Sequence, residues 1–75
     1  MILDIGRVCK KVTGREAGKY CIVLDKVDKN TVLVDGDVKR GNVNIAHLEP
    51  LPAVVKVKQG AKTEEVLEAL DQAGF

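Results

Sequence analysis

The side chains best suited to covalent chemistry in this chain are two cysteines and one histidine. These are Cys9, Cys21 and His47, and because the sequence contains no serine, a serine-based catalytic triad is excluded. A thiolate activated by His47 would be the remaining nucleophile. Both cysteines, however, lie in apolar segments typical of strands, where burial raises a thiol pKa and makes the thiol unreactive. We therefore expect no enzyme, and two buried thiols that pack as small hydrophobic groups.

The chain also offers no convincing site for a metal, a nucleotide or another cofactor. Its two cysteines and single histidine cannot complete a tetrahedral zinc site. The segment closest to a phosphate-binding P-loop is GREAGK at residues 14–19, but its glycines are one residue too close together. Tyr20 follows where a P-loop needs Ser or Thr, and a second strand is predicted there instead of a helix. We expect neither a bound nucleotide nor a metal.

Basic side chains gathered near two predicted loops suggest binding of a polyanion without catalysis. Guanidinium and ammonium groups bind phosphate oxygens, and a tyrosine ring can stack on a base or ribose. The candidate RNA-binding residues are Arg7, Lys10, Lys11, Arg15, Lys19, Tyr20, Lys39 and Arg40. Either cluster could instead be a charged, solvated turn. The binding hypothesis requires both loops to lie on one side of the fold, with their charges not neutralised by neighbouring carboxylates.

Two glycines shape the first of these loops, the segment TGREAGKY at residues 13–20. Gly14 and Gly18 can adopt a positive φ, which lets a short connection reverse direction and approach another backbone closely. Arg15 and Lys19, beside these glycines, are then expected to project outward.

The elements that must hold these loops are mostly strands. Patterns of apolar and β-branched residues predict strands at 5–12, 20–27, 31–34, 38–45 and 53–58, with Gly41 as a bulge or bend. The run YCIVLDKV at 20–27 is nearly continuous, as in a strand buried on both faces. Turns are predicted at 28–30 and at Asp35-Gly36, and a tight, 3₁₀-like turn at 44–49 that Pro50 and Pro52 terminate.

The last segment changes to helical periodicity. Thr63 is the expected N-cap of this helix, and Gly74 is expected to end it. Glu64 and Glu65 fall in the first turn, where the helix dipole favours negative charge. The apolar positions are Val66, Leu67, Leu70 and Ala73. We predict a mainly β, single-domain protein: a small barrel of about five strands at 1–58, with a short 3₁₀ turn, and a C-terminal helix at 62–75 packed on or appended to it.

Length and charge agree with a small globular module. The chain has 75 residues and a net charge of +1, so it is neither large enough for two cores nor a polycation. Residues 1–49 carry 9 basic and 7 acidic side chains, and residues 50–75 carry 3 and 4, so the helix is the acidic part. Without an apolar run of about 18 residues, or positive charge ahead of the first apolar stretch, we expect no membrane segment and no signal peptide. A cytoplasmic protein that is monomeric in isolation follows as the expectation.

Several of these segments together resemble a known family. The strings IGRVC at 5–9 and GREAGKYCIVLD at 14–25 resemble a KOW motif, a strand–loop–strand unit with a central glycine. With VLVDG at 32–36 and NIAHLEP at 44–50, the chain resembles the archaeal and eukaryotic large-subunit ribosomal protein L-fourteen-e family. The similarity covers residues 2–58 and continues into the C-terminal helix.

This resemblance implies an SH3-like barrel with a structural role in the large ribosomal subunit, in contact with ribosomal RNA and neighbouring ribosomal proteins. It implies no catalysis and no cofactor, and it makes Gly18 the key glycine of the motif. Eukaryotic members carry a long basic C-terminal extension, whereas this chain has an acidic helix. The alternative function is a KOW-type protein-interaction module, as in transcription elongation factors, which the near-zero net charge also suits.

Overall fold

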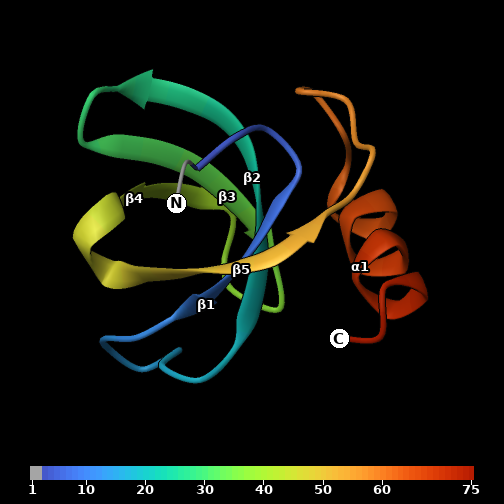
Figure 1. Cartoon of the computed structure of the whole chain (residues 1–75), viewed down its shortest axis with the longest axis horizontal. Coiled ribbons are helices and arrows are strands. Elements are labelled where there is room, and N and C mark those ends of the chain that lie inside the picture. The colour runs from blue at the N-terminus through green and yellow to red at the C-terminus, as the bar shows by residue number, and fades with distance from the viewer. Residues whose placement is uncertain (1–2) are drawn as a thin grey trace.

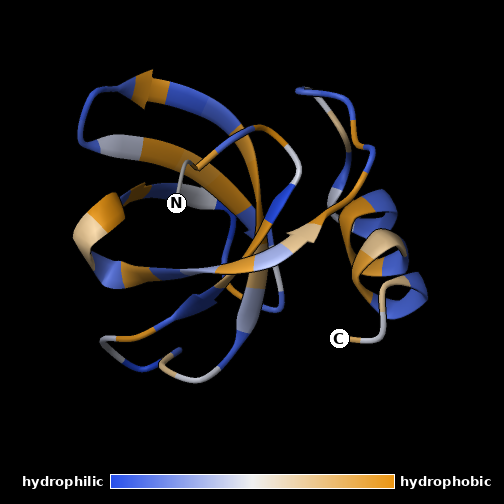
Figure 2. Ribbon diagram, viewed as in Figure 1, coloured by the Kyte–Doolittle hydropathy of each residue, from blue (hydrophilic) through white to orange (hydrophobic). Residues whose placement is uncertain are grey.

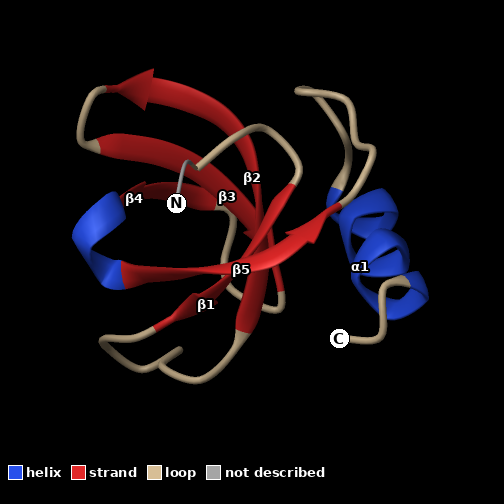
Figure 3. Ribbon diagram, viewed as in Figure 1, coloured by secondary structure: helices blue, strands red, loops and turns tan. Residues whose placement is uncertain are grey.

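Five antiparallel strands and one C-terminal helix make up the fold, which a computed structural model describes for residues 3–75 (Figures 1 and 3). The elements in chain order are β1 (Arg7–Lys11), β2 (Tyr20–Asp28), β3 (Thr31–Gly36), β4 (Gly41–Asn44), the 3₁₀ turn η1 (Ile45–His47), β5 (Leu48–Val54) and α1 (Thr63–Gln72). The strands form one sheet in the order β4-β3-β2-β1-β5.

The sheet curls strongly, so its two edges come round toward each other (Figure 1). Register shifts in the β2–β3 and β1–β5 ladders accompany this curvature, as bulges commonly do. Turn η1 connects the edge strands β4 and β5, and the Asn44 side chain caps it by accepting a hydrogen bond from the Ala46 N–H at 2.9 Å. The predicted mainly β, barrel-like fold with a 3₁₀ turn and one helix is confirmed, although no ladder joins β4 to β5 within residues 3–75.

Strand β2 is buried on both faces, as its nearly continuous apolar sequence predicted. Cys21 and Val23 face the inside of the curled sheet, whereas Ile22 and Leu24 face the helix. All four are fully buried. Figure 2 shows the hydrophobic residues along the middle of β2 and hydrophilic residues on the outer side of α1.

Two hydrophobic clusters therefore share the sheet. The inner cluster consists of Cys9, Cys21, Val23, Val32, Val34, Val38 and Leu48. The outer cluster, between sheet and helix, consists of Val8, Ile22, Leu24, Ala61, Val66 and Leu70. Of the predicted apolar helix positions, Val66 and Leu70 are buried, while Leu67 and Ala73 are exposed because they lie off the contact stripe.

Hydrogen bonds around one buried carboxylate connect the helix to the sheet. Asp35, in β3, is only 1% exposed. Its Oδ2 accepts hydrogen bonds from Thr63 Oγ1 at 2.6 Å and from Arg40 Nη1 at 3.1 Å, and its Oδ1 accepts one from the Gly36 N–H at 2.8 Å. Arg40 Nη1 also donates to the Ala61 carbonyl at 2.7 Å. These bonds satisfy the buried carboxylate and join β3, the loop after it and the start of α1.

The hairpin that Asp35-Gly36 predicted is present, since β3 pairs antiparallel with β4, but its turn does not lie at these two residues. Both residues lie within β3, where Asp35 is paired with Ile22 and Gly36 with Cys21. Glycine is favoured there because its φ is 136°, a conformation that residues with a side chain rarely adopt. A Cβ on Gly36 would also lie 3.2 Å from the Cys21 Cα and 2.7 Å from Leu70 Cδ1 of the helix. The reversal comes later, at 37–40, so β4 begins at Gly41 and not at Val38.

Three further expectations were wrong in their boundaries. Pro50 and Pro52 lie inside β5, which tolerates them because it is an edge strand. Residues 55–58, predicted as part of a strand, lie beyond the end of β5. Strand β1 is shorter than residues 5–12. The N-cap is Lys62, whose backbone N–H donates to Glu65 Oε1 at 3.4 Å, because the Thr63 hydroxyl is used to bind Asp35.

The bond between Thr63 and Asp35 predicts a measurable loss of stability when the hydroxyl is removed. Thr63→Val keeps the shape of the side chain but leaves Asp35 Oδ2 with one partner fewer, so the free energy of unfolding should fall by about 1–2 kcal/mol. Urea unfolding followed by circular dichroism measures this difference. Thr63→Ser, which retains the hydroxyl, is the control and should stay much closer to the wild type. Equal losses in both variants would contradict the assigned role of the hydroxyl.

The two cysteines should be unreactive in the native protein. Burial raises the pKa of Cys9 to about 11 and that of Cys21 to about 12. Alkylation by iodoacetamide at neutral pH should therefore be slow until denaturant is added, as mass spectrometry would show. Because both thiols ionise more easily in the unfolded chain, stability should fall as the pH rises from about 9 toward these values. Rapid alkylation without unfolding would contradict the buried, packed arrangement.

Candidate nucleic-acid interface

The first basic loop, residues 12–19, is a tightly hydrogen-bonded connection between β1 and β2. The Lys11 N–H donates to the Lys19 carbonyl at 2.9 Å, and the Gly18 N–H donates to the Lys11 carbonyl at 2.7 Å. Inside the loop, the Lys19 N–H donates to the Glu16 carbonyl at 3.1 Å. Gly14 and Gly18 have φ values of 77° and 90°, as their loop positions predicted. A Cβ on either glycine would meet no atom within 4 Å, so conformation and not close approach requires them.

The second basic loop, residues 37–40, lies against the first. The Lys39 backbone N–H donates to Glu16 Oε2 at 2.6 Å, and Glu16 Oε1 lies 3.8 Å from Lys11 Nζ. Both loops lie at the lower end of the molecule in Figure 1, away from the turn between β2 and β3. The structure thus brings the two loops to one side of the fold, the arrangement that the binding hypothesis required.

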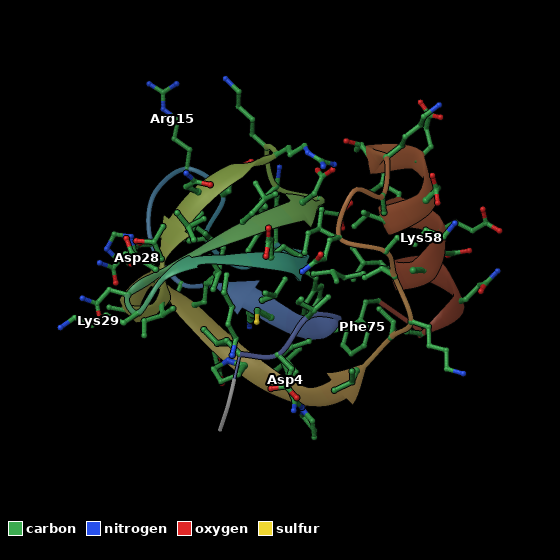
Figure 4. The ribbon with its side chains drawn as sticks, turned by 90° about the horizontal axis from the view of Figure 1, so that it is seen from above. Asp4, Arg15, Asp28, Lys29, Lys58 and Phe75 are labelled. Carbon is green, nitrogen blue, oxygen red and sulfur yellow. The ribbon has the colours of Figure 1, made fainter. Side chains whose placement is uncertain are left out.

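Three cationic side chains on these loops are exposed and form no ion pair with residues 3–75. They are Arg15 and Lys19 on the first loop and Lys39 on the second. Figure 4 shows Arg15 extending away from the body of the protein, on the side opposite to Lys58. Lys10, in β1, is half-buried, and Asp37 adds one exposed acid to the second loop.

The other three cations among the candidate residues are bound to carboxylates of the fold. Arg7 Nη2 lies 3.5 Å from Asp4 Oδ2, and Arg7 Nη1 donates to the Leu51 carbonyl at 3.0 Å, so this side chain ties β1 to β5. Lys11 pairs with Glu16, and Arg40 pairs with the buried Asp35. These contacts assign Arg7 and Arg40 to holding the fold together.

Tyr20 lies half-buried where the first loop enters β2. Its ring packs against Phe75 with centroids 5.0 Å apart and planes tilted by 56°. The aromatic face that sequence analysis assigned to a base or ribose is therefore in contact with the C-terminal residue of this chain.

Sequence analysis missed Asp35, the residue that fixes Arg40. The sequence pattern places Asp35, between Val34 and Gly36, in a turn, whereas it lies within β3. The available signal was its position: Asp35 follows three β-formers directly, and an arginine stands five residues later. A buried carboxylate needs such a partner.

Residues 3–75 show neither a cysteine–histidine catalytic pair nor a cluster of metal ligands. Cys9 and Cys21 are fully buried, whereas His47 is exposed, so no thiol–imidazole pair is formed. Residues 3–75 contain no group of three or more His, Cys, Asp or Glu side chains placed to hold a metal ion. Over the same residues, no helix has the length and apolar character needed to cross a membrane.

Comparison with known proteins gives a consistent result. The chain is 49% identical to the large ribosomal subunit protein eL14 of Methanococcus vannielii, over 97% of this chain and 95% of that protein. It is 47% identical to the eL14 proteins of Staphylothermus marinus and Sulfolobus acidocaldarius, over 97% of this chain and 81% of each. No family model matches the chain. At this identity and coverage the resemblance found in the sequence is confirmed, and the chain belongs to the eL14 family of large ribosomal subunit proteins.

Proposed function

We propose that this protein is a non-enzymatic, structural constituent of the large ribosomal subunit that supports translation by binding ribosomal RNA. It works as a rigid spacer, in which the folded sheet and helix hold the two basic loops against RNA phosphates. The observation that carries this proposal is the contact between the loops at Glu16 and Lys39, which gathers exposed cations from both on one side.

The RNA-facing surface is composed of Arg15, Lys19 and Lys39, with Lys10 at its margin. Exposed cations on rigid loops are suited to RNA binding, because most protein contacts to RNA involve phosphate and ribose and do not depend on the base sequence. Lys11, Arg7, Arg40 and Tyr20 act mainly behind this surface, through the contacts that they make within the fold.

The remaining parts of the proposal follow from membership of the eL14 family. The protein resides in the cytoplasm on ribosomes, contacts neighbouring ribosomal proteins, needs no cofactor, and is monomeric when isolated. Residues 1–58 and the helix at 62–75 act as one domain, since the Asp35 bonds and the outer hydrophobic cluster join them.

A double substitution on the first loop tests the RNA contact. Arg15→Ala combined with Lys19→Ala should weaken binding to transcribed large-subunit ribosomal RNA. It should also reduce the slope of log K against log salt concentration by about two, because two phosphate contacts are lost. Filter binding or fluorescence anisotropy over a salt series measures both quantities.

The matched control removes the same charge from another part of the surface. Lys56→Ala combined with Lys58→Ala alters two exposed lysines beyond β5, and Lys58 lies on the side opposite to Arg15 in Figure 4. This variant should keep nearly the wild-type slope. Identical slopes for the two double variants would count against the loop assignment. Recovery of the protein with RNA polymerase and not with large subunits would favour the alternative interaction module.

A further inference from the structure

We propose that Glu16 is a positioning residue for RNA binding, and that the hydrogen bond its side-chain oxygen accepts from Lys39 strengthens binding by fixing the two basic loops together. This inference rests on the proposed function and identifies what arranges the RNA-facing surface. It also runs against simple electrostatics, in which an acid between phosphate-binding cations repels the RNA.

The geometry of Glu16 joins three parts of the chain. Its Oε2 accepts the Lys39 N–H at 2.6 Å, its Oε1 lies 3.8 Å from Lys11 Nζ, and its own carbonyl accepts the Lys19 N–H at 3.1 Å. One residue thus connects the second loop, the end of β1 and the end of the first loop.

The bond to Lys39 is the only side-chain hydrogen bond between the two loops within residues 3–75. It joins positions 23 apart in the sequence. Hydrogen bonds in which the acceptor is ionised are shorter and stronger than neutral ones, which agrees with the 2.6 Å distance. Arg40 and the Asp37 N–H, which donates to the Tyr20 carbonyl at 3.1 Å, hold the two ends of the second loop, and the Glu16 bond fixes Lys39 between them. Without that bond, Lys39 would be ordered only when RNA binds, and the entropic cost would reduce the affinity.

The second loop supplies a control acid. Asp37 is exposed and, within residues 3–75, its carboxylate forms no hydrogen bond or ion pair. Removing Asp37 therefore changes the charge of the surface by the same amount as removing Glu16, but leaves the contact between the loops intact.

The test compares Glu16→Ala with Asp37→Ala in binding to transcribed large-subunit ribosomal RNA at a fixed, moderate salt concentration. Both variants gain one unit of positive charge, so electrostatics alone predicts tighter binding by both. We expect tighter binding only by Asp37→Ala, and binding weakened roughly five-fold by Glu16→Ala. Glu16→Gln, whose amide oxygen can still accept the Lys39 N–H, should recover most of the affinity. Glu16→Ala that binds as tightly as Asp37→Ala would overturn the inference.

A second measurement does not depend on RNA. Hydrogen exchange of the Lys39 amide in the free protein should be slowed in the wild type and in Asp37→Ala, and faster in Glu16→Ala. Equal exchange in all three proteins would overturn the inference even if RNA binding is weakened. If the wild type itself does not bind the RNA while the Lys39 amide is protected by Glu16, the proposed function fails and the contact between the loops stands.

Discussion

The buried carboxylate of Asp35 is the constraint on which the arrangement of this small domain depends. A charge with 1% exposure is tolerable only when its oxygens are satisfied, and here the partners come from the adjacent backbone, the following loop and the first residue of α1. The helix covers the sheet in the place where Thr63 can reach Asp35 and where Gly36 leaves room for Leu70. Arg40, drawn inward to the same carboxylate and to the Ala61 carbonyl, sets the path of the second basic loop.

Acidic residues thus divide the basic ones into two groups. Asp4, Glu16 and Asp35 pair with Arg7, Lys11 and Arg40, and these three cations thereby contribute to the fold. Among the candidate RNA-binding residues, the exposed cations left without such partners within residues 3–75 are Arg15, Lys19 and Lys39, and these lie on the two joined loops. A chain with a net charge of only +1 can in this way present a local positive surface, because four of its acids lie on α1 and Asp35 is buried.

Much of the fold followed from local patterns. The two-sided burial of β2, the 3₁₀ turn after Asn44, the glycine-hinged first loop and the C-terminal helix were all predicted, because each depends on neighbours within one element. The errors involve residues whose partners are distant in the chain. Asp35-Gly36 reads as a turn until Thr63 and Leu70 are known to pack there. Pro50 was predicted to end the turn at 44–49, whereas it lies within β5, an edge strand that tolerates proline.

By itself, the sequence determined the class of fold, the family, the buried and unreactive character of the cysteines, and which residues carry positive charge. Only the tertiary structure decided which of those charges are available. Side-chain type is a local property. The carboxylates that pair with Arg7, Lys11 and Arg40 lie only three to five residues away in the chain, but the pairs form only because the folded backbone brings the charges together. The contact of Glu16 with Lys39 joins positions 23 apart and depends on the folding of both loops. The interaction between exposed charges is screened over about 8–10 Å at physiological salt, so the position of each carboxylate matters more than the total charge.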